Sequence, residues 1–127
     1  MDQQAIVNYW RESAERDWRA AKDMLKGGHR SWALFLCHLS LEKSFKAIIA
    51  GQGKEIPYIH ELIRLAREAG LTVDQTLTTQ LNEITTFNLE ARYDDFKQAF
   101  YKKATLAYAE QWMKLGEEIY LWLKNQS

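Results

Sequence analysis

A run of charged and aromatic side chains from Asn88 to Lys103, NLEARYDDFKQAFYKK, contains the residue types that bind or transform anions. It places one arginine, two aspartates and three lysines close together. Guanidinium and ammonium groups hold phosphates and carboxylates through charge-assisted hydrogen bonds. The run is therefore either a catalytic loop or the solvated corner between two helices.

A second set of polar side chains falls on stripes that are otherwise apolar. Its members are Asp17 on the first predicted helix and His38, Glu42 and Lys46, one turn apart, on the second. A charged side chain turned inward is costly unless it is paired, so each should have a partner. Asp17 and His38 are expected to be satisfied core groups, with a polar groove as the alternative. Glu42 and Lys46 have the spacing of a helical ion pair.

His60 opens the predicted short helix in YIHELIRLA, where we expect a contact near the N-cap or a packed ring, with a ligand role as the alternative. A di-metal site in a bundle needs Glu-x-x-His pairs, and no glutamate is followed by a histidine at that spacing. The three histidines also lack mutual metal-ligand spacing, and no Gly-rich phosphate loop is present. Neither a metal nor a cofactor is therefore expected.

Length and composition favour a single domain over residues 1–127. The chain has 127 residues, 46% of them hydrophobic, with 17 basic and 17 acidic side chains. A net charge of 0 argues against a broadly basic nucleic-acid surface, so any anion site must be local. Cys37 lies in an apolar run and is expected to pack as a small hydrophobe. No window reaches the ~18 apolar residues of a membrane span, which predicts a cytoplasmic protein without membrane contact.

Apolar residues at three- and four-residue spacing predict the helices that must position these side chains. The predicted ranges are 3–26, 31–50 with Ser31 as N-cap, a short helix at 60–69, a helix capped by Asp74 that reaches Ala91, and a last helix at about 103–124. No segment alternates with period two. The sequence therefore predicts an all-α fold, an antiparallel up-and-down bundle of four long helices plus one short helix.

Four motifs, in this order and spacing, resemble the HEPN domain, which is named for higher eukaryotes and prokaryotes and for nucleotide binding. They are A-x-x-D (Ala14 to Asp17), F-x-x-H-x-x-x-E-K-x-x-K-A (Phe35 to Ala47), His60 followed by Leu62, and N-x-x-A-R-Y (Asn88 to Tyr93). The resemblance implies a helical bundle that is commonly a homodimer. Short prokaryotic members are frequently encoded beside a minimal nucleotidyltransferase as a toxin-antitoxin pair, and many are metal-independent ribonucleases.

The ribonuclease motif of this family is an arginine, a polar residue and a histidine, with four to six residues between the arginine and the histidine. Arg92 and Tyr93 match its start, but the histidine is missing. The corresponding positions hold Lys97, Gln98 and Ala99. These side chains do not shuttle protons at neutral pH as imidazole does. Tyr101 falls where some members carry a tyrosine that the nucleotidyltransferase modifies.

The resemblance thus implies a dimeric HEPN domain that binds a nucleotide or RNA phosphate, or a partner protein, with hydrolysis lost or much reduced. The implied site residues are Arg92, Tyr93, Lys97, Tyr101 and Lys102, with Lys103 nearby and with Asp17, His38, Glu42 and His60 as supporting polar residues. One alternative is an active ribonuclease toxin that uses Lys97 or a histidine recruited from position 38 or 60. Another is a plain helical dimerisation protein, in which Arg92 pairs with Asp94, Asp95 or Glu42 and only fixes the corner.

Overall fold

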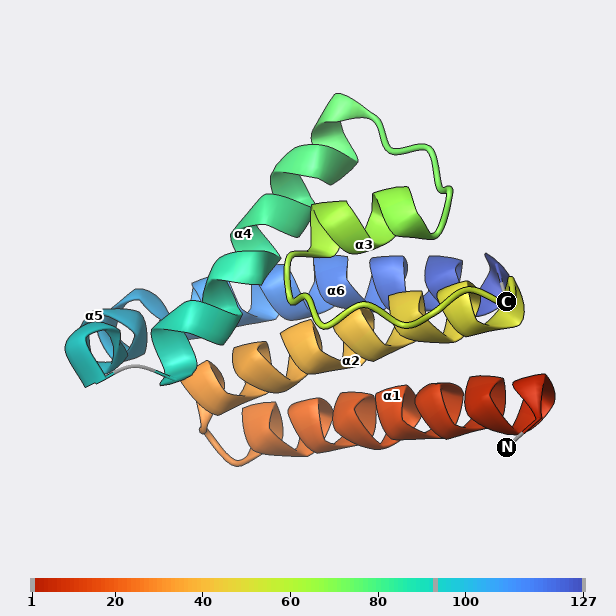
Figure 1. Ribbon diagram of the computed structural model, residues 1–127. Coiled ribbons are helices and arrows are strands. Elements are labelled where there is room, and N and C mark those ends of the chain that lie inside the picture. The colour runs from red at the N-terminus through yellow and green to blue at the C-terminus, as the bar shows by residue number, and fades with distance from the viewer. Residues whose placement is uncertain (1, 93, 127) are drawn as a thin grey trace.

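The computed structural model describes residues 2–92 and 94–126, and the side chains of residues 2–88 and 96–126. Its elements are α1 (Gln3–Lys26), α2 (Arg30–Gly51), α3 (Leu62–Glu68), α4 (Gln75–Arg92), α5 (Asp94–Lys103) and α6 (Leu106–Gln126). Chain direction alternates through α1, α2, α4 and α6, while α5 lies at the end of the bundle opposite the termini (Figure 1). The predicted all-α, up-and-down bundle is confirmed.

Helix α2 forms the centre of the bundle because its side chains are apolar nearly all round. It packs against α1, α6, α4 and α3. Leu34, Leu41, Phe45 and Ile49 are fully buried along it. Cys37 is also fully buried, as predicted, and burial raises the pKa of its thiol to about 12. This thiol is therefore a packing group rather than a nucleophile.

The local sequence correctly predicts the N-cap of α4 but not that of α2. Asp74 caps α4 as predicted, because its carboxylate accepts a hydrogen bond from the Leu77 amide at 2.8 Å. Ser31 as the cap of α2 is wrong, since α2 begins at Arg30 and His29 occupies the cap position. The turn after α1 explains the difference. The His29 amide donates to the Met24 carbonyl at 2.8 Å, so the next helix starts as soon as this turn closes.

Helix α5 replaces the predicted corner between the fourth and last helices, and the last helix begins later than predicted. Phe100 of α5 is buried and stacks on Phe87 of α4, with ring centroids 5.7 Å apart. Helix α6 then begins at Leu106, because the Thr105 hydroxyl accepts the Tyr108 amide at 3.2 Å as an N-cap. A separate short helix, rather than a loop, therefore carries residues 94–103.

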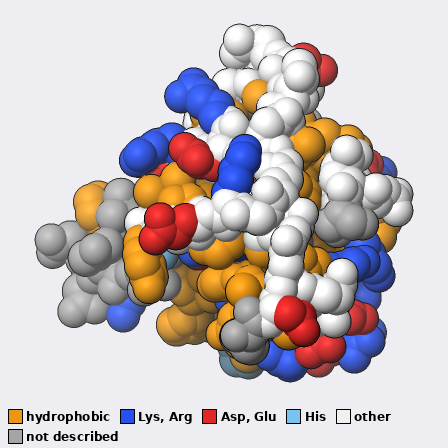
Figure 2. Space-filling model, turned by 45° about the vertical axis from the view of Figure 1, so that its right-hand side comes forward, with side chains coloured by type: hydrophobic (Ala, Val, Ile, Leu, Met, Phe, Trp, Pro, Cys, Tyr) orange, Lys and Arg blue, Asp and Glu red, His pale blue; other side chains and the backbone are white. Residues whose placement is uncertain are grey.

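Basic and acidic side chains lie among one another over the face shown in Figure 2. This mixture agrees with the balanced composition. Among the helices of the described residues, none has both the length and the apolar character that crossing a bilayer requires.

Candidate functional site

The predicted anion site lies where α4 ends and α5 begins. Arg92 is the last residue of α4, and its side chain lies outside the described residues, as does all of Tyr93. Lys97, Tyr101 and Lys102 are exposed on α5, which follows immediately. The structure therefore brings the end of α4 next to a helix that presents cations to solvent.

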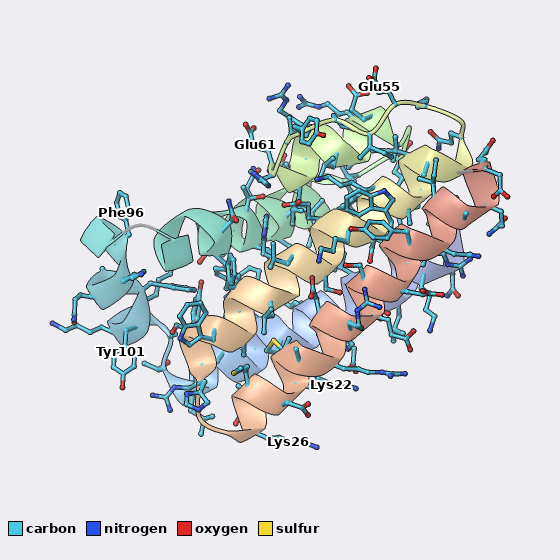
Figure 3. All side chains as sticks on the ribbon, turned by 60° about the horizontal axis from the view of Figure 1, so that its bottom comes forward. Lys22, Lys26, Glu55, Glu61, Phe96 and Tyr101 are labelled. Carbon is cyan, nitrogen blue, oxygen red and sulfur yellow. The ribbon has the colours of Figure 1, made fainter. Side chains whose placement is uncertain are left out.

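Two aromatic rings accompany these cations. Phe96 and Tyr101, 44% and 69% exposed, project outward from α5 at the end of the bundle (Figure 3). Lys97 is four residues before Tyr101, so both side chains lie on one face of the helix. Cationic groups hold phosphate oxygens, and an exposed ring stacks on a base. This surface can bind an anion, but no histidine occurs in residues 94–103 to carry a proton.

The Lys103 ammonium group contacts side chains of both α4 and α6. Its Nζ lies 3.1 Å from Glu83 Oε2 and 5.5 Å from the centroid of the Tyr108 ring. The Tyr108 hydroxyl donates to the same carboxylate. Partial burial works to raise the pKa of Glu83, but the hydrogen bonds from Tyr108 and Lys103 and the lysine charge outweigh it and lower that pKa.

The interactions of Glu83 with Lys103 and Tyr108 connect the end of α5 to α4 and α6. The sequence did not predict them. The sequence pattern places Tyr108 only on an apolar stripe and indicates no role for Glu83. The two residues are 25 positions apart, so no helical spacing connects them. Only the folding of α4 against α6 brings them together.

A buried polar cluster joins α2 to the segment before α3. Glu42 Oε1 accepts a hydrogen bond from His60 Nδ1 at 2.8 Å, and Glu42 Oε2 accepts one from Lys46 Nζ at 3.0 Å. His38 Nε2 donates to the His60 carbonyl at 2.9 Å. Lys46 also lies over the Trp10 ring of α1, 5.3 Å from its centroid. The predicted ion pair of Glu42 with Lys46 is confirmed, and His60 is its third member.

Glu42 is ionised in this cluster although only 5% of the residue is exposed. Burial alone would raise the pKa of the carboxyl group. The hydrogen bonds from His60 and Lys46, followed by the charges of Lys46 and His38, outweigh burial and hold that pKa below its ordinary value. The cluster therefore contains a fixed negative charge beside an imidazole whose side chain is 53% exposed.

Asp17 is not part of this cluster. Its carboxylate lies 2.7 Å from Lys43 Nζ, across the interface of α1 and α2. The expectation that Asp17 and His38 each have a polar partner is therefore confirmed. Of the four supporting residues, Asp17 therefore lies apart from the other three, His38, Glu42 and His60. The only exposed titratable ring among these four residues is that of His60.

The segment that carries His60 leads into α3 beside α4, and the corner lies at the end of α4. The Leu62 amide donates to the Thr85 hydroxyl at 3.1 Å, which places the start of α3 beside α4. Thr85 precedes Arg92 by about two helical turns, or roughly 10 Å along the axis. No group of three or more His, Cys, Asp or Glu in the described part of the chain could hold a metal ion.

The alternating helices define an all-helical bundle in which an arginine ends α4 and the next helix, α5, presents lysines to solvent. The sequence matches the HEPN domain over residues 7–126, and the chain belongs to this family. The resemblance drawn from the four motifs is thereby confirmed.

The crystal structure of TT1696 from Thermus thermophilus is similar in fold. The TM-score is 0.82 at 20% sequence identity, and the match covers 95% of this chain and 98% of TT1696. At that identity the likeness shows the fold alone. No curated protein matches the sequence significantly.

Proposed function

We propose that residues 1–127 form a single HEPN domain that binds a phosphate group of a nucleotide or RNA at the corner of α4 and α5. In this proposal the protein is a cytoplasmic homodimer with hydrolysis lost or much reduced. The site residues are Arg92, Tyr93, Lys97, Tyr101 and Lys102.

The observation that carries this proposal is the composition of α5. Lys97, Tyr101 and Lys102 are exposed on it, so cationic and aromatic groups face solvent directly after Arg92. The positions that would hold the motif histidine carry Lys97, Gln98 and Ala99, so none of them supplies an imidazole. Such a surface holds an anion without a group to move protons during cleavage.

The partner in this proposal is a minimal nucleotidyltransferase in a toxin-antitoxin type of pair. Tyr101 supports it, because the ring is 69% exposed and open to a modifying enzyme. Incubation of the two proteins with a nucleoside triphosphate should label the wild type and leave Tyr101→Phe unlabelled. Equal labelling of both proteins would remove Tyr101 from this role.

Binding of a fluorescent single-stranded RNA, followed by anisotropy at low salt, tests the site. Arg92→Ala and Lys97→Ala should each weaken binding by about tenfold, with a smaller salt dependence. Arg67→Ala, which removes an exposed cation from α3, is the matched control and should change little. If Arg92→Ala lowers the melting temperature and leaves binding unchanged, the chain is a plain dimerisation protein.

A second candidate function, an active ribonuclease, is favoured by the geometry of His60. The buried carboxylate of Glu42 fixes the Nδ1 tautomer, which leaves Nε2 as the nitrogen that can accept a proton. This pairing of an imidazole with a carboxylate is used in general base catalysis. His38 is unsuited to the role because it is fully buried.

Cleavage of RNA by variants of His60 decides between the two functions. If the protein is a ribonuclease of this kind, His60→Ala should abolish cleavage, and Glu42→Gln should lower its rate while leaving RNA binding intact. If the wild type does not cleave RNA under the same conditions, this second candidate is excluded.

A further inference from the structure

The end of the bundle that carries α5 holds most of the exposed aromatic rings. Among the described residues, five aromatic side chains are exposed, namely Tyr9, Trp32, Tyr58, Phe96 and Tyr101. Three of them lie at this end, since Trp32 is in the first turn of α2 and both Phe96 and Tyr101 are on α5 (Figures 1 and 3). Trp32, at 50%, is also the only one of the five tryptophans in the described chain that is exposed. This end therefore presents a larger aromatic surface than α5 supplies alone.

The start of α2 is fixed beside the end of α5. Arg30 Nε donates a hydrogen bond at 2.8 Å to the carbonyl of Ala104, the residue that follows α5. Helix α2 also packs against both α4 and α5. Because α2 and α4 run in opposite directions, the first turn of α2 lies at the end of the bundle where α4 reaches Arg92 (Figure 1). Trp32 follows Arg30 by about 3 Å along the helix axis, so it belongs to the same end of the bundle as the proposed phosphate site.

The Trp32 indole is oriented by a neighbour on its own helix. Its ring and that of Phe35 form a T-shaped pair, with centroids 6.1 Å apart and an angle of 78° between the planes. Phe35 is partly buried and packs against the hydrophobic core. In a T-shaped pair each ring covers at most one face of the other. Phe35 therefore orients the indole and leaves at least one of its faces for another planar group.

Cations accompany these rings in only a small excess. Helix α5 carries three lysines against two aspartates, a net charge of +1. Lys97 and Lys102 are exposed on it, whereas the Lys103 ammonium group contacts Glu83. Phosphate contacts alone therefore hold a nucleic acid weakly at this end. Stacking of one base on an aromatic ring is worth roughly tenfold in affinity or more, so the rings can contribute as much as the cations.

A single-stranded nucleic acid fits this surface better than another protein does. Lysine is depleted from protein interfaces, where its strongly hydrated ammonium group would lose water. Lysines beside exposed aromatic rings are instead the pattern that binds single strands, because the cations hold the backbone and the rings stack on unpaired bases. A duplex keeps its bases stacked on one another and does not offer them to an indole.

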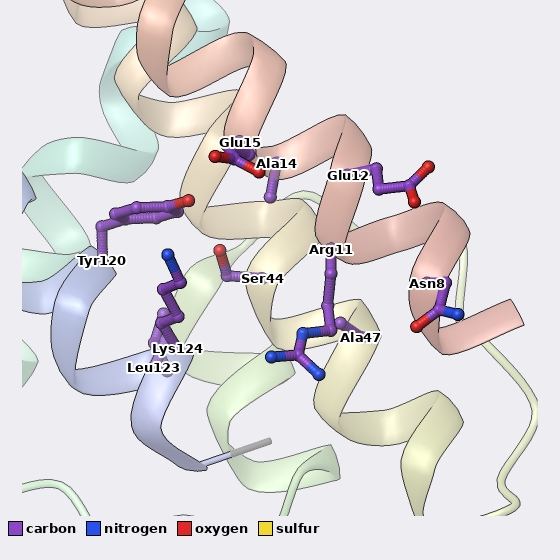
Figure 4. A pocket seen from close by; sticks show the side chains of 10 residues that line it. All are labelled: Asn8, Arg11, Glu12, Ala14, Glu15, Ser44, Ala47, Tyr120, Leu123 and Lys124. Atoms are coloured by element: carbon purple, nitrogen blue, oxygen red, sulfur yellow. The ribbon is translucent and has the colours of Figure 1, made fainter. Parts of the chain in front are cut away.

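The opposite end of the bundle contains a hollow without these features. It has a volume of about 200 Å³ and lies between α1 and α6 (Figure 4). Arg11 and Lys124 line it together with Glu12 and Glu15, so its charges balance. The one aromatic ring in its lining, that of Tyr120, is only 7% exposed. This hollow therefore offers neither an open ring nor an excess of cations.

We propose that Trp32 stacks on a base of the single-stranded RNA whose phosphate binds at the corner of α4 and α5. This inference rests on the function proposed for that corner. It adds recognition of unpaired bases without sequence preference, because every base has a face that can stack.

Two single strands of equal length, oligouridylate and its abasic analogue, separate stacking from phosphate binding because both carry the same phosphates. In fluorescence anisotropy at low salt, the wild type should bind oligouridylate about tenfold more tightly, which corresponds to about 1.4 kcal/mol. Trp32→Ala should remove most of this difference and leave binding of the abasic strand unchanged. Trp32→Leu, which keeps an apolar side chain beside Phe35, should do the same. Trp32→Phe should keep most of the preference, because it retains an aromatic face.

Tyr9→Ala is the matched control, because it removes a ring that is 54% exposed on α1. It should leave both affinities unchanged. Arg92→Ala should weaken binding of both strands, which tests the phosphate site separately.

Equal affinities of the wild type for the two strands, or equal weakening of both by Trp32→Ala, would overturn the stacking proposal. The phosphate site would still stand in that case if Arg92→Ala weakens both. If sedimentation shows that Trp32→Ala dissociates a dimer, Trp32 belongs to an interface between copies and the stacking proposal is wrong. If neither strand binds to the wild type, the stacking proposal and the phosphate site are both wrong.

Discussion

His60 Nδ1 donates a hydrogen bond to Glu42 Oε1 at 2.8 Å, so a buried carboxylate of α2 fastens the segment that precedes α3. The other oxygen of the same carboxylate holds Lys46, which is 5% exposed. One side chain therefore neutralises a buried ammonium group and orients an exposed imidazole at the same time.

Replacing Glu42 by alanine should destabilise the fold strongly. The change leaves the Lys46 charge buried without its carboxylate, which costs about 3 kcal/mol or more in comparable pairs. The free energy of unfolding in urea measures the effect. Glu12→Ala, an exposed glutamate on α1, is the control and should change this free energy by no more than about 0.5 kcal/mol. Equal losses in the two variants would show that the cluster does not stabilise the fold.

The stability of the protein should fall in acid because of Glu42 and Glu83. The pKa of each carboxyl group is lower in the folded chain than its ordinary value of 4.5, so the unfolded chain binds more protons near that pH. The resulting stabilisation is fully present above pH 4.5 and is lost as the pH falls through the folded values. Urea unfolding between neutral pH and about pH 3 should show this decline, and Glu42→Gln should flatten it. A decline of the same steepness in both proteins would contradict the assignment to Glu42.

Gly116→Ala should destabilise α6 although alanine is the better helix former. A Cβ at position 116 would collide with the Cys37 sulfur, while the nearest Trp18 atom would lie at an ordinary 3.7 Å. Overpacking of this kind costs about 1–3 kcal/mol. Cys37→Ala should remove the collision, so that Gly116→Ala becomes neutral or stabilising in that background, consistent with a helix propensity gain of about 1 kcal/mol. A double-mutant cycle with no coupling would refute this contact.

Tyr108→Phe should loosen α5 without disturbing the aromatic cluster below it. The variant keeps the ring contacts to Phe87 and Trp112 but removes the hydroxyl that donates to Glu83. The loss of a hydrogen bond to a charged group predicts about 1.5 kcal/mol of destabilisation and faster amide hydrogen exchange in α5. Tyr9→Phe, at an exposed position on α1, should have neither effect.

The sequence sufficed to predict the first two long helices because their apolar stripes run over many turns and end at glycines. The range 3–26 coincides with α1, and the range 31–50 differs from α2 by one residue at each end. Helix α5 escaped prediction because its length of ten residues gives the periodic signal few apolar positions. One contact near its end is tertiary. Arg30 Nε donates to the Ala104 carbonyl at 2.8 Å from 74 residues away.

The sequence identified most polar residues of the site, but it did not show which of them form hydrogen bonds with one another. Helical spacing placed His38, Glu42 and Lys46 on one face of α2, and their burial confirms it. Spacing could not assign His60 to Glu42, because the course of the segment between α2 and α3 depends on its packing against α2 and α4. In the same way, nothing local linked Glu83 to Tyr108.

Because α5 contains no histidine, the corner of α4 and α5 should bind an RNA phosphate without cleaving the RNA strand. Incubation of purified wild-type protein in excess over a labelled single-stranded RNA at neutral pH tests this most directly, with binding and strand length followed together. Salt-dependent binding that Arg92→Ala weakens, with the RNA left intact, is the predicted result. Prompt cleavage by the wild type that disappears in Arg92→Ala would contradict it.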